Sequence, residues 1–205
     1  KAKLQEIMGD LQDPVHLVYF TQEFECRTCA DGRQFVEEMS ELSDKVSYEV
    51  LDFVADDAKA KEYGVDKIPA IVVLDKDKKD NGIRFYGIPG GYEINSFLSA
   101  LREVSGKGEQ IPPGITDRIK AIDKKMHIQV FITMTCPHCP GAVSTAHRLA
   151  LDNEHIIADM VDATVFPELS NRYNVMGVPK IVINETTELV GNQPMPAFLK
   201  AMEGL

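Results

Sequence analysis

The amino-acid sequence repeats itself at a spacing of 110 residues. Two CxxC pairs, Cys26–Cys29 and Cys136–Cys139, stand at this spacing and account for all four cysteines of the 205-residue chain. The other distinctive matches in the same register are Asp52 with Asp162, Tyr63 with Tyr173, Val65 with Val175, and Pro69 with Pro179. Self-similarity at a fixed period indicates a duplicated structural unit. We therefore expect two copies of one fold.

Each copy carries the same order of secondary-structure signals. An apolar, β-branched run at 15–21 or 127–133 predicts a buried strand directly before the CxxC pair. Apolar residues at helical spacing follow the pair, and a second strand is predicted at 48–53 or 158–163. A polar helix, an X-Pro step, two strands and a final helix complete the unit. This alternation predicts an α/β fold.

The segment SGKGEQIPPG at 105–114 is rich in glycine and proline and has no apolar periodicity. Such a composition is typical of a connection between folded units. We therefore expect one domain at 1–110, with the CRTC pair, and a second at 111–205, with the CPHC pair.

The formal net charge of −10 disfavours nucleic acid as a partner, because phosphate backbones require a clustered basic surface. No apolar run approaches the roughly 20 residues that a membrane span needs. The first 14 residues, KAKLQEIMGDLQDP, lack the apolar core of a signal peptide. From these features we expect a cytoplasmic protein without membrane or nucleic-acid partners.

The cysteine spacing favours reactive sites over structural cross-links. A disulfide restricts the unfolded chain most when it closes a long loop, whereas a CxxC ring closes almost none. One structural alternative is a zinc site built from all four sulfurs. Its CxxC pairs are typically separated by about 15–20 residues, far less than the spacing in this chain.

Each half resembles a thioredoxin fold, and the whole chain resembles the protein disulfide oxidoreductases of thermophilic archaea and bacteria, which are glutaredoxin-like tandem proteins. The most specific stretches lie at 41–53, 136–140, 146–154 and 173–183. The N-terminal domain of the alkyl hydroperoxide reductase flavoprotein has the same tandem architecture, although that family typically lacks a working CxxC in its first half. The resemblance implies two tandem thioredoxin-like folds, each a mixed central sheet flanked by helices.

A CxxC pair at the start of a helix favours the thiolate of its first cysteine, because unpaired backbone N–H groups and the positive end of the helix dipole face that sulfur. The second sulfur lies deeper and can resolve a mixed disulfide. We therefore expect Cys26 and Cys136 to be nucleophiles, with Cys29 and Cys139 as the resolving thiols.

The two pairs differ in their flanking charge. His138 lies inside the CPHC pair and adds a partial positive charge close to the thiolate. Arg27 lies inside the CRTC pair, but the carboxylates of Glu23, Glu25 and Asp31 oppose it. We therefore expect CPHC to be the more reactive and more oxidising pair.

The resemblance also assigns roles to Pro69 and Pro179. In thioredoxin folds the corresponding proline is cis and faces the CxxC pair. In this chain such a step would present the backbone of Ile68 or Val178 for strand-like pairing with a bound peptide. The sequence itself shows only two prolines in register with the cysteine pairs.

Thioredoxins carry a buried aspartate in the strand before CxxC, where it accepts a proton from the resolving cysteine. Phe20 and Val130 stand six residues before the first cysteine of each pair, so that acid is absent. Acids of the neighbouring strand are the possible substitutes. They are Glu49 or Asp52 in the first half, and Asp159 or Asp162 in the second.

The resemblance implies a thiol–disulfide oxidoreductase that reduces, oxidises or isomerises protein disulfides through mixed disulfides. It needs no cofactor, because the electrons reside on the sulfur pairs, and a thioredoxin-reductase-like flavoprotein would recharge it. One alternative is an electron relay from such a flavoprotein to a peroxiredoxin. Another is a scaffold or chaperone in which the thiols are incidental.

Overall fold

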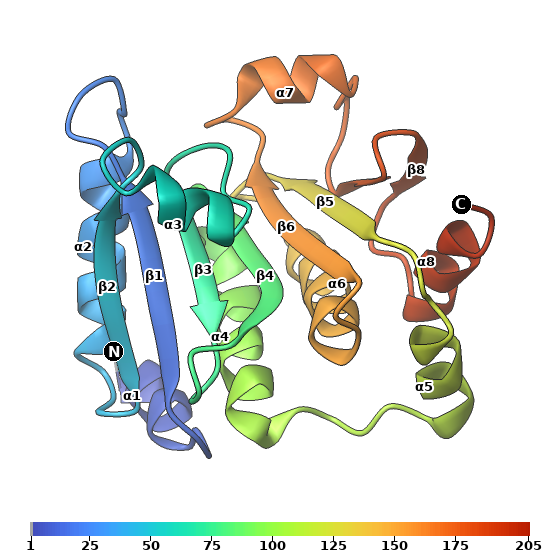
Figure 1. Ribbon diagram of the computed structural model, residues 1–205, viewed down its shortest axis with the longest axis horizontal. Coiled ribbons are helices and arrows are strands. Elements are labelled where there is room, and N and C mark those ends of the chain that lie inside the picture. The colour runs from blue at the N-terminus through green and yellow to red at the C-terminus, as the bar shows by residue number, and fades with distance from the viewer. Residues whose placement is uncertain (1) are drawn as a thin grey trace.

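The computed structural model describes the backbone of residues 2–205 and the side chains of residues 4–205. Within this range no helix is both long and apolar enough to cross a membrane. In chain order the elements are α1 (Ala2–Gly9), β1 (Val15–Thr21), α2 (Cys29–Ser40), β2 (Val46–Asp52), α3 (Asp57–Glu62), β3 (Ala70–Leu74), β4 (Asp80–Tyr86), η1 (Gly91–Glu93), α4 (Ile94–Arg102), η2 (Glu103–Lys107), α5 (Pro113–Lys120), β5 (Met126–Ile132), α6 (Cys139–Asp152), β6 (Ile156–Asp162), α7 (Pro167–Arg172), β7 (Lys180–Ile183), β8 (Thr187–Val190) and α8 (Met195–Met202) (Figure 1).

All eight strands form one mixed sheet in the order β2-β1-β3-β4-β6-β5-β7-β8 (Figure 1). In each half a parallel pair is followed by an antiparallel hairpin, so one four-strand unit occurs twice. The halves join where β4 pairs in parallel with β6, from Ile83 opposite Ala158 to Tyr86 opposite Val161. The predicted tandem α/β fold is confirmed. The division into domains at residue 110 stays a prediction, since the sheet is continuous.

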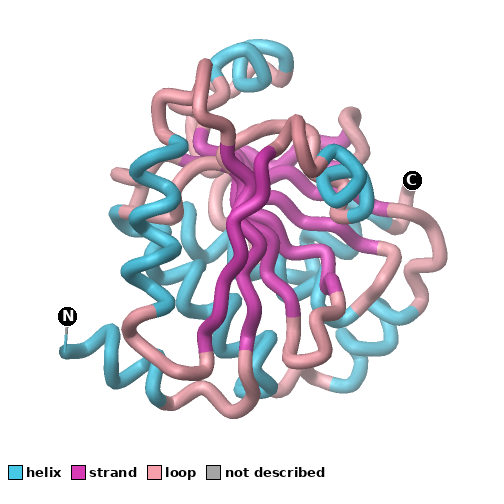
Figure 2. Tube along the Cα trace, turned by 60° about the vertical axis from the view of Figure 1, so that its left-hand side comes forward, coloured by secondary structure: helices cyan, strands magenta, loops and turns pink. Residues whose placement is uncertain are grey.

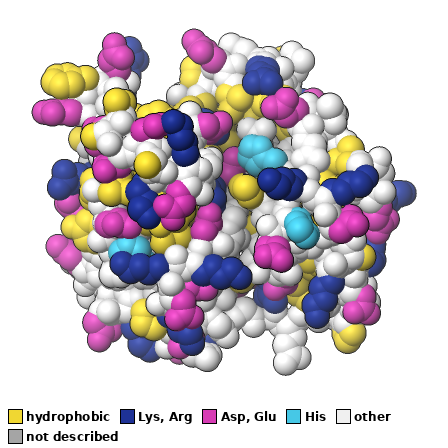
Figure 3. Space-filling view, in the orientation of Figure 1, with side chains coloured by type: hydrophobic (Ala, Val, Ile, Leu, Met, Phe, Trp, Pro, Cys, Tyr) yellow, Lys and Arg dark blue, Asp and Glu magenta, His cyan; other side chains and the backbone are white. Residues whose placement is uncertain are grey.

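Two apolar cores lie on opposite faces of this sheet, and the strands fan out between the helices in Figure 2. The larger core packs the sheet against α2, α4, α6 and α8. The smaller core lies under α3 and α7. On this second side of the molecule, acidic and basic side chains are interspersed and form no single-sign patch (Figure 3).

The repeat is not uniform. Strands β1 and β5 begin at Val15 and Met126, so they are offset by 111 residues, whereas the cysteines are offset by 110. The loop before Cys26 therefore contains one residue more than the loop before Cys136. Because strand side chains alternate between faces, this changes which positions correspond. The residue equivalent to Val130 is Tyr19, and both face the larger core.

Phe20, which the sequence spacing pairs with Val130, instead faces the smaller core on the other side of the sheet. The comparison of Phe20 with Val130 as equivalent positions was therefore wrong. The conclusion drawn from it needs one change: the position that faces the CxxC helix from the first strand holds a tyrosine.

The helix of the second CxxC pair is anchored on a strand of the first half. His147 in α6 is buried, and its Nε2 lies 3.1 Å from the carbonyl oxygen of Arg84 in β4. Burial lowers the pKa of His147 to about 4, so the ring is neutral at pH 7 and donates to that carbonyl. Arg84 is itself fixed by a bidentate pair with Asp80 at 2.9 and 2.6 Å. The first half thus helps to position α6.

Candidate active site

Each CxxC pair is closed by its own disulfide, Cys26–Cys29 and Cys136–Cys139. The Cα–Cα distances are 5.5 and 5.6 Å, within the normal range for a disulfide. Helices α2 and α6 begin at Cys29 and Cys139. The first cysteine of each pair therefore precedes its helix, as the sequence predicted.

The two sulfurs of each pair differ in burial. Cys29 and Cys139 are 3% and 0% exposed, whereas Cys26 is half-buried and Cys136 is 8% exposed. The first cysteine is thus the outer one in both pairs, which suits attack by the first thiol and resolution by the second. Cys136 is the more enclosed of the two outer cysteines.

The helix termini leave backbone donors free near the sulfurs. Thr28 and His138 are the N-cap residues of α2 and α6, and within the described chain neither side chain caps its helix with a hydrogen bond. The first-turn N–H groups of a helix have no intrahelical partner. Arg27 and His138 are both exposed beside these turns, where their side chains can meet an incoming partner.

The prolines lie where the resemblance predicts. The Ile68–Pro69 and Val178–Pro179 peptide bonds are both cis, with each proline buried and the preceding residue half-buried. In the second half, Cys136 Sγ lies 3.8 Å from the Val178 carbonyl oxygen. The Val178 backbone is therefore directly beside the outer sulfur of the CPHC pair.

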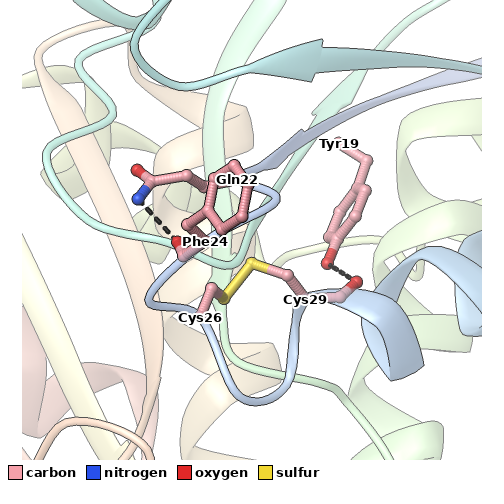
Figure 4. Close-up of a disulfide and its surroundings, with 5 residues drawn as sticks. All are labelled: Tyr19, Gln22, Phe24, Cys26 and Cys29. Carbon is pink, nitrogen blue, oxygen red and sulfur yellow. Dashed lines mark hydrogen bonds between the residues drawn. A yellow bond between two sulfur atoms is a disulfide. The ribbon is translucent and has the colours of Figure 1, made fainter.

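The loop before the CRTC pair is shown in Figure 4. Gln22 Nε2 donates to the carbonyl oxygen of Phe24 at 2.7 Å, and the Phe24 ring is 73% exposed. Glu25 has a φ of +59°, in the left-handed region that non-glycine residues rarely adopt. The extra residue of this loop is thus accommodated by a sharp turn that leaves an aromatic ring in solvent beside Cys26.

Tyr19 lies beneath the CRTC helix and could not be found from the cysteine spacing. Its side chain is fully buried, and its hydroxyl donates to the Cys29 carbonyl oxygen at 2.7 Å (Figure 4). Burial raises the pKa of Tyr19 to about 12, so the phenol stays protonated near pH 7. The sequence signal for this position was masked by the one-residue difference between the two loops.

The four acids expected as proton acceptors all bind groups outside the CxxC pairs. Their partners are His16 for Glu49, the Val54 and Ala55 amides for Asp52, His127 for Asp159, and the Thr164 amide and hydroxyl for Asp162. Asp159 and Asp162 are buried. Neither acid of the first half shares that burial.

A different carboxylate, Glu93, is fully buried. It belongs to η1, which packs against α6, and the neighbouring Tyr92 amide donates to the Met134 carbonyl oxygen at 3.0 Å. Burial raises the pKa of Glu93 to about 7, and the charge of Asp162 adds to the effect, while a hydrogen bond from the Ser96 hydroxyl opposes it. Its Oε1 has no hydrogen-bond partner among the described residues.

The sequence offers no signal that singles out Glu93. It follows two glycines at the start of a helix, a place where an acid normally complements the helix dipole in solvent. Its burial follows from the packing of η1 against α4 and α6 in the folded chain.

Gly91 allows η1 to approach the Met134 carbonyl oxygen closely. Its replacement by alanine is therefore expected to disturb the second pair. Gly91 has a φ of +57°, and a Cβ there would lie 2.3 Å from the Met134 carbonyl oxygen. We expect Gly91→Ala to destabilise the chain by roughly 2–3 kcal/mol in urea unfolding.

Gly64→Ala is the matched control, because Gly64 has a φ of +61° with nothing within 4 Å of an added Cβ. Gly64→Ala should lower the free energy of unfolding by only about 1 kcal/mol, because it adds backbone strain without a steric clash. Equal losses in the two variants would contradict a steric role for Gly91.

Comparisons with known proteins agree with this geometry. A thioredoxin domain family model matches residues 126–203. Over 98% of this chain and 96% of the other, the structure is similar to the N-terminal domain of the alkyl hydroperoxide reductase AhpF from Enterococcus faecalis, with a TM-score of 0.93 and 31% identity. A protein disulfide oxidoreductase from Aeropyrum pernix matches with a TM-score of 0.91 and 27% identity, over 99% of this chain and 92% of that one.

Two curated relatives are longer than this chain. An NADH dehydrogenase of Bacillus subtilis is 26% identical over 202 residues, which are 98% of this chain and 37% of the relative. The AhpF protein of the Staphylococcus aureus alkyl hydroperoxide reductase is 34% identical over 111 residues, 54% of this chain and 22% of the relative. The chain thus spans well under half the length of these relatives.

Proposed function

Because this chain belongs to the tandem thioredoxin-fold family that includes the N-terminal domain of the alkyl hydroperoxide reductase AhpF, we propose that both of its CxxC pairs exchange electrons with disulfides of partner proteins. The chain is a thiol–disulfide oxidoreductase. The observation that carries the proposal is that each pair has an outer sulfur before a helix and an inner sulfur within it.

The exchange has two steps at each pair. In the reduced pair, the Cys136 thiolate attacks one sulfur of the partner disulfide, forming a mixed disulfide and releasing a partner thiolate. Cys139, as a thiolate, then attacks the Cys136 sulfur and releases the second partner thiolate. Two electrons pass from the pair to the partner. Cys26 and Cys29 take the same roles in the first half.

A second candidate function is an electron relay, favoured by the AhpF relatives. A thioredoxin-reductase-like flavoprotein would reduce the pairs, and a peroxiredoxin would be the final acceptor. We propose a cytoplasmic setting for either function. Insulin reduction tests general protein-disulfide exchange, whereas flavoprotein-driven turnover of a peroxiredoxin tests the relay. A chain that supports neither would contradict the proposed function.

The two pairs are expected to differ in reduction potential. Carboxylates at 23, 25 and 31 flank the CRTC pair, and negative charge disfavours its thiolate. A more stable thiolate makes a disulfide more oxidising. We expect CPHC to be the more oxidising pair by about 30 mV, a tenfold difference in equilibrium constant.

The measurement uses two chains with one working pair each, Cys26→Ser/Cys29→Ser and Cys136→Ser/Cys139→Ser. Each is equilibrated with glutathione at defined ratios. A more oxidising CRTC pair would reverse the predicted order.

A further inference from the structure

The first pair has a buried hydrogen bond behind its inner cysteine. Tyr19 reaches from β1 to the first turn of α2 and donates its phenolic hydrogen to the Cys29 carbonyl oxygen at 2.7 Å (Figure 4). The ring is fully buried in the larger core. The bond is therefore buried away from bulk solvent, which strengthens it relative to one in water.

Gly32 provides the space for this phenol. A Cβ on Gly32 would lie 2.4 Å from Tyr19 Oη and 3.0 Å from Tyr19 Cζ. Glycine inside a helix costs about 1 kcal/mol relative to alanine. In α2 the absence of a side chain at Gly32 offsets that cost, because it allows the Tyr19 hydroxyl to approach the first turn.

The second half lacks both members of this arrangement. Val130 takes the position of Tyr19 on the strand, and Ala142 takes the position of Gly32 as the fourth residue of its helix. Both are fully buried. The tyrosine and the glycine thus occur together in one half and are replaced together in the other.

A peptide group that accepts a hydrogen bond at its carbonyl oxygen becomes a stronger donor at its N–H, because hydrogen bonds in a chain polarise one another. The N–H of the peptide that begins with the Cys29 carbonyl belongs to Ala30, in the first turn of α2. First-turn N–H groups are the donors that stabilise a thiolate before a helix.

We propose that Tyr19, seated against Gly32, is a positioning residue that makes the CRTC disulfide more oxidising by strengthening the first-turn donors of α2. The inference rests on the proposed disulfide exchange at this pair. Because its own hydroxyl stays protonated, Tyr19 acts as a hydrogen-bond donor and takes no proton from Cys29.

The test uses the Cys136→Ser/Cys139→Ser chain, in which only the CRTC pair reacts. One protein disulfide and two glutathione thiols convert to two protein thiols and one glutathione disulfide, with two electrons passing to the protein. For Tyr19→Phe we expect the equilibrium constant for this reduction to fall about threefold, or ~14 mV. Alkylation of Cys26 by iodoacetamide at pH 7 should slow by a similar factor.

Tyr63→Phe is the matched control, since Tyr63 is buried in the smaller core and its hydroxyl makes no hydrogen bond among the described residues. It should leave both values unchanged. A parent chain that glutathione cannot reduce would contradict the proposed function. A parent that cycles normally, together with a Tyr19→Phe chain of the same equilibrium constant, would overturn the inference alone.

Gly32→Ala gives a second, independent test. Its methyl group displaces the hydroxyl, so we expect the same fall in the equilibrium constant as for Tyr19→Phe. In the Tyr19→Phe/Gly32→Ala chain the two effects should not add, because the hydrogen bond is already lost. Additive effects would show that Gly32 does not act by leaving space for the Tyr19 hydroxyl.

Discussion

Replacing Cys136 by serine, in a chain whose CRTC cysteines are already serines, is expected to lower the rate of disulfide reduction by on the order of 10³-fold or more. The reason is that a serine hydroxyl is not ionised at pH 7 and cannot attack a disulfide sulfur. Cys136 is the outer cysteine of its pair, and its sulfur lies 3.8 Å from the Val178 carbonyl oxygen. Insulin reduction with dithiothreitol as the electron source measures the rate.

Cys139→Ser in the same background is the matched comparison. It removes the inner, fully buried sulfur and leaves the nucleophile intact. The variant should form a mixed disulfide with its partner and stop there, so mass spectrometry should detect the covalent complex. If Cys136→Ser traps the complex and Cys139→Ser does not, the assigned roles are reversed.

The fold was largely predictable because it depends on a repeated pattern. The matching cysteines and prolines placed the same strands and helices in both halves. The pairing of the two halves into one continuous sheet was not predicted. In the structure, residues 83–86 of β4 are all buried, whereas β8 alternates between half-buried and exposed residues. A strand buried on both faces belongs to a sheet interior. The sequence does not say which strand of the other half lies next to it.

The site was predictable only where it is local. The cysteines follow from short motifs, the cis geometry of the prolines was implied by the family resemblance, and the structure places Val178 beside Cys136. Tyr19 was missed because one extra residue in the loop before Cys26 shifts which residues of β1 face the CxxC helix. Glu93 was missed because its burial depends on how η1 packs in the folded chain, against α4 and α6. Neither depends on a motif that spacing alone can show.

Glu93→Gln is expected to slow disulfide exchange at the CPHC pair by about 10²-fold. Resolution requires Cys139 to lose its proton in a buried site. Glu93 is a buried carboxylate on an element that packs against the helix of that cysteine, and its Oε1 has no hydrogen-bond partner among the described residues. With a pKa of about 7, Glu93 can accept a proton near neutral pH. The wild-type rate should therefore rise between pH 6 and 8, and this rise should be lost in the variant. Stopped-flow kinetics of the chain with serines at 26 and 29 measures both.

Although Glu93→Gln is expected to slow exchange, it should raise the free energy of unfolding. The pKa of Glu93 is raised from 4.5 to about 7 in the folded chain, so its favourable contribution is complete below about pH 4.5 and is lost as the pH rises through 7. Glutamine carries no charge and escapes that loss. We expect Glu93→Gln to be more stable than the parent by roughly 2–3 kcal/mol at pH 8, with little difference at pH 4.5, in urea unfolding.

Glu103→Gln separates the two effects. Burial also raises the pKa of Glu103 to about 7, but this carboxylate lies in η2 and pairs with Arg148, nine residues after Cys139 in α6. The Glu103 variant should therefore share the direction of the pH-dependent gain in stability and keep the parent rate of exchange. The two acids share a raised pKa and lie in different elements, η1 and η2. An equal loss of rate in both variants would therefore show that Glu93 acts only through the general stability of the fold. If only Glu93→Gln lowers the rate of exchange, the residue that accepts the proton at the second CxxC pair belongs to the first half of the chain.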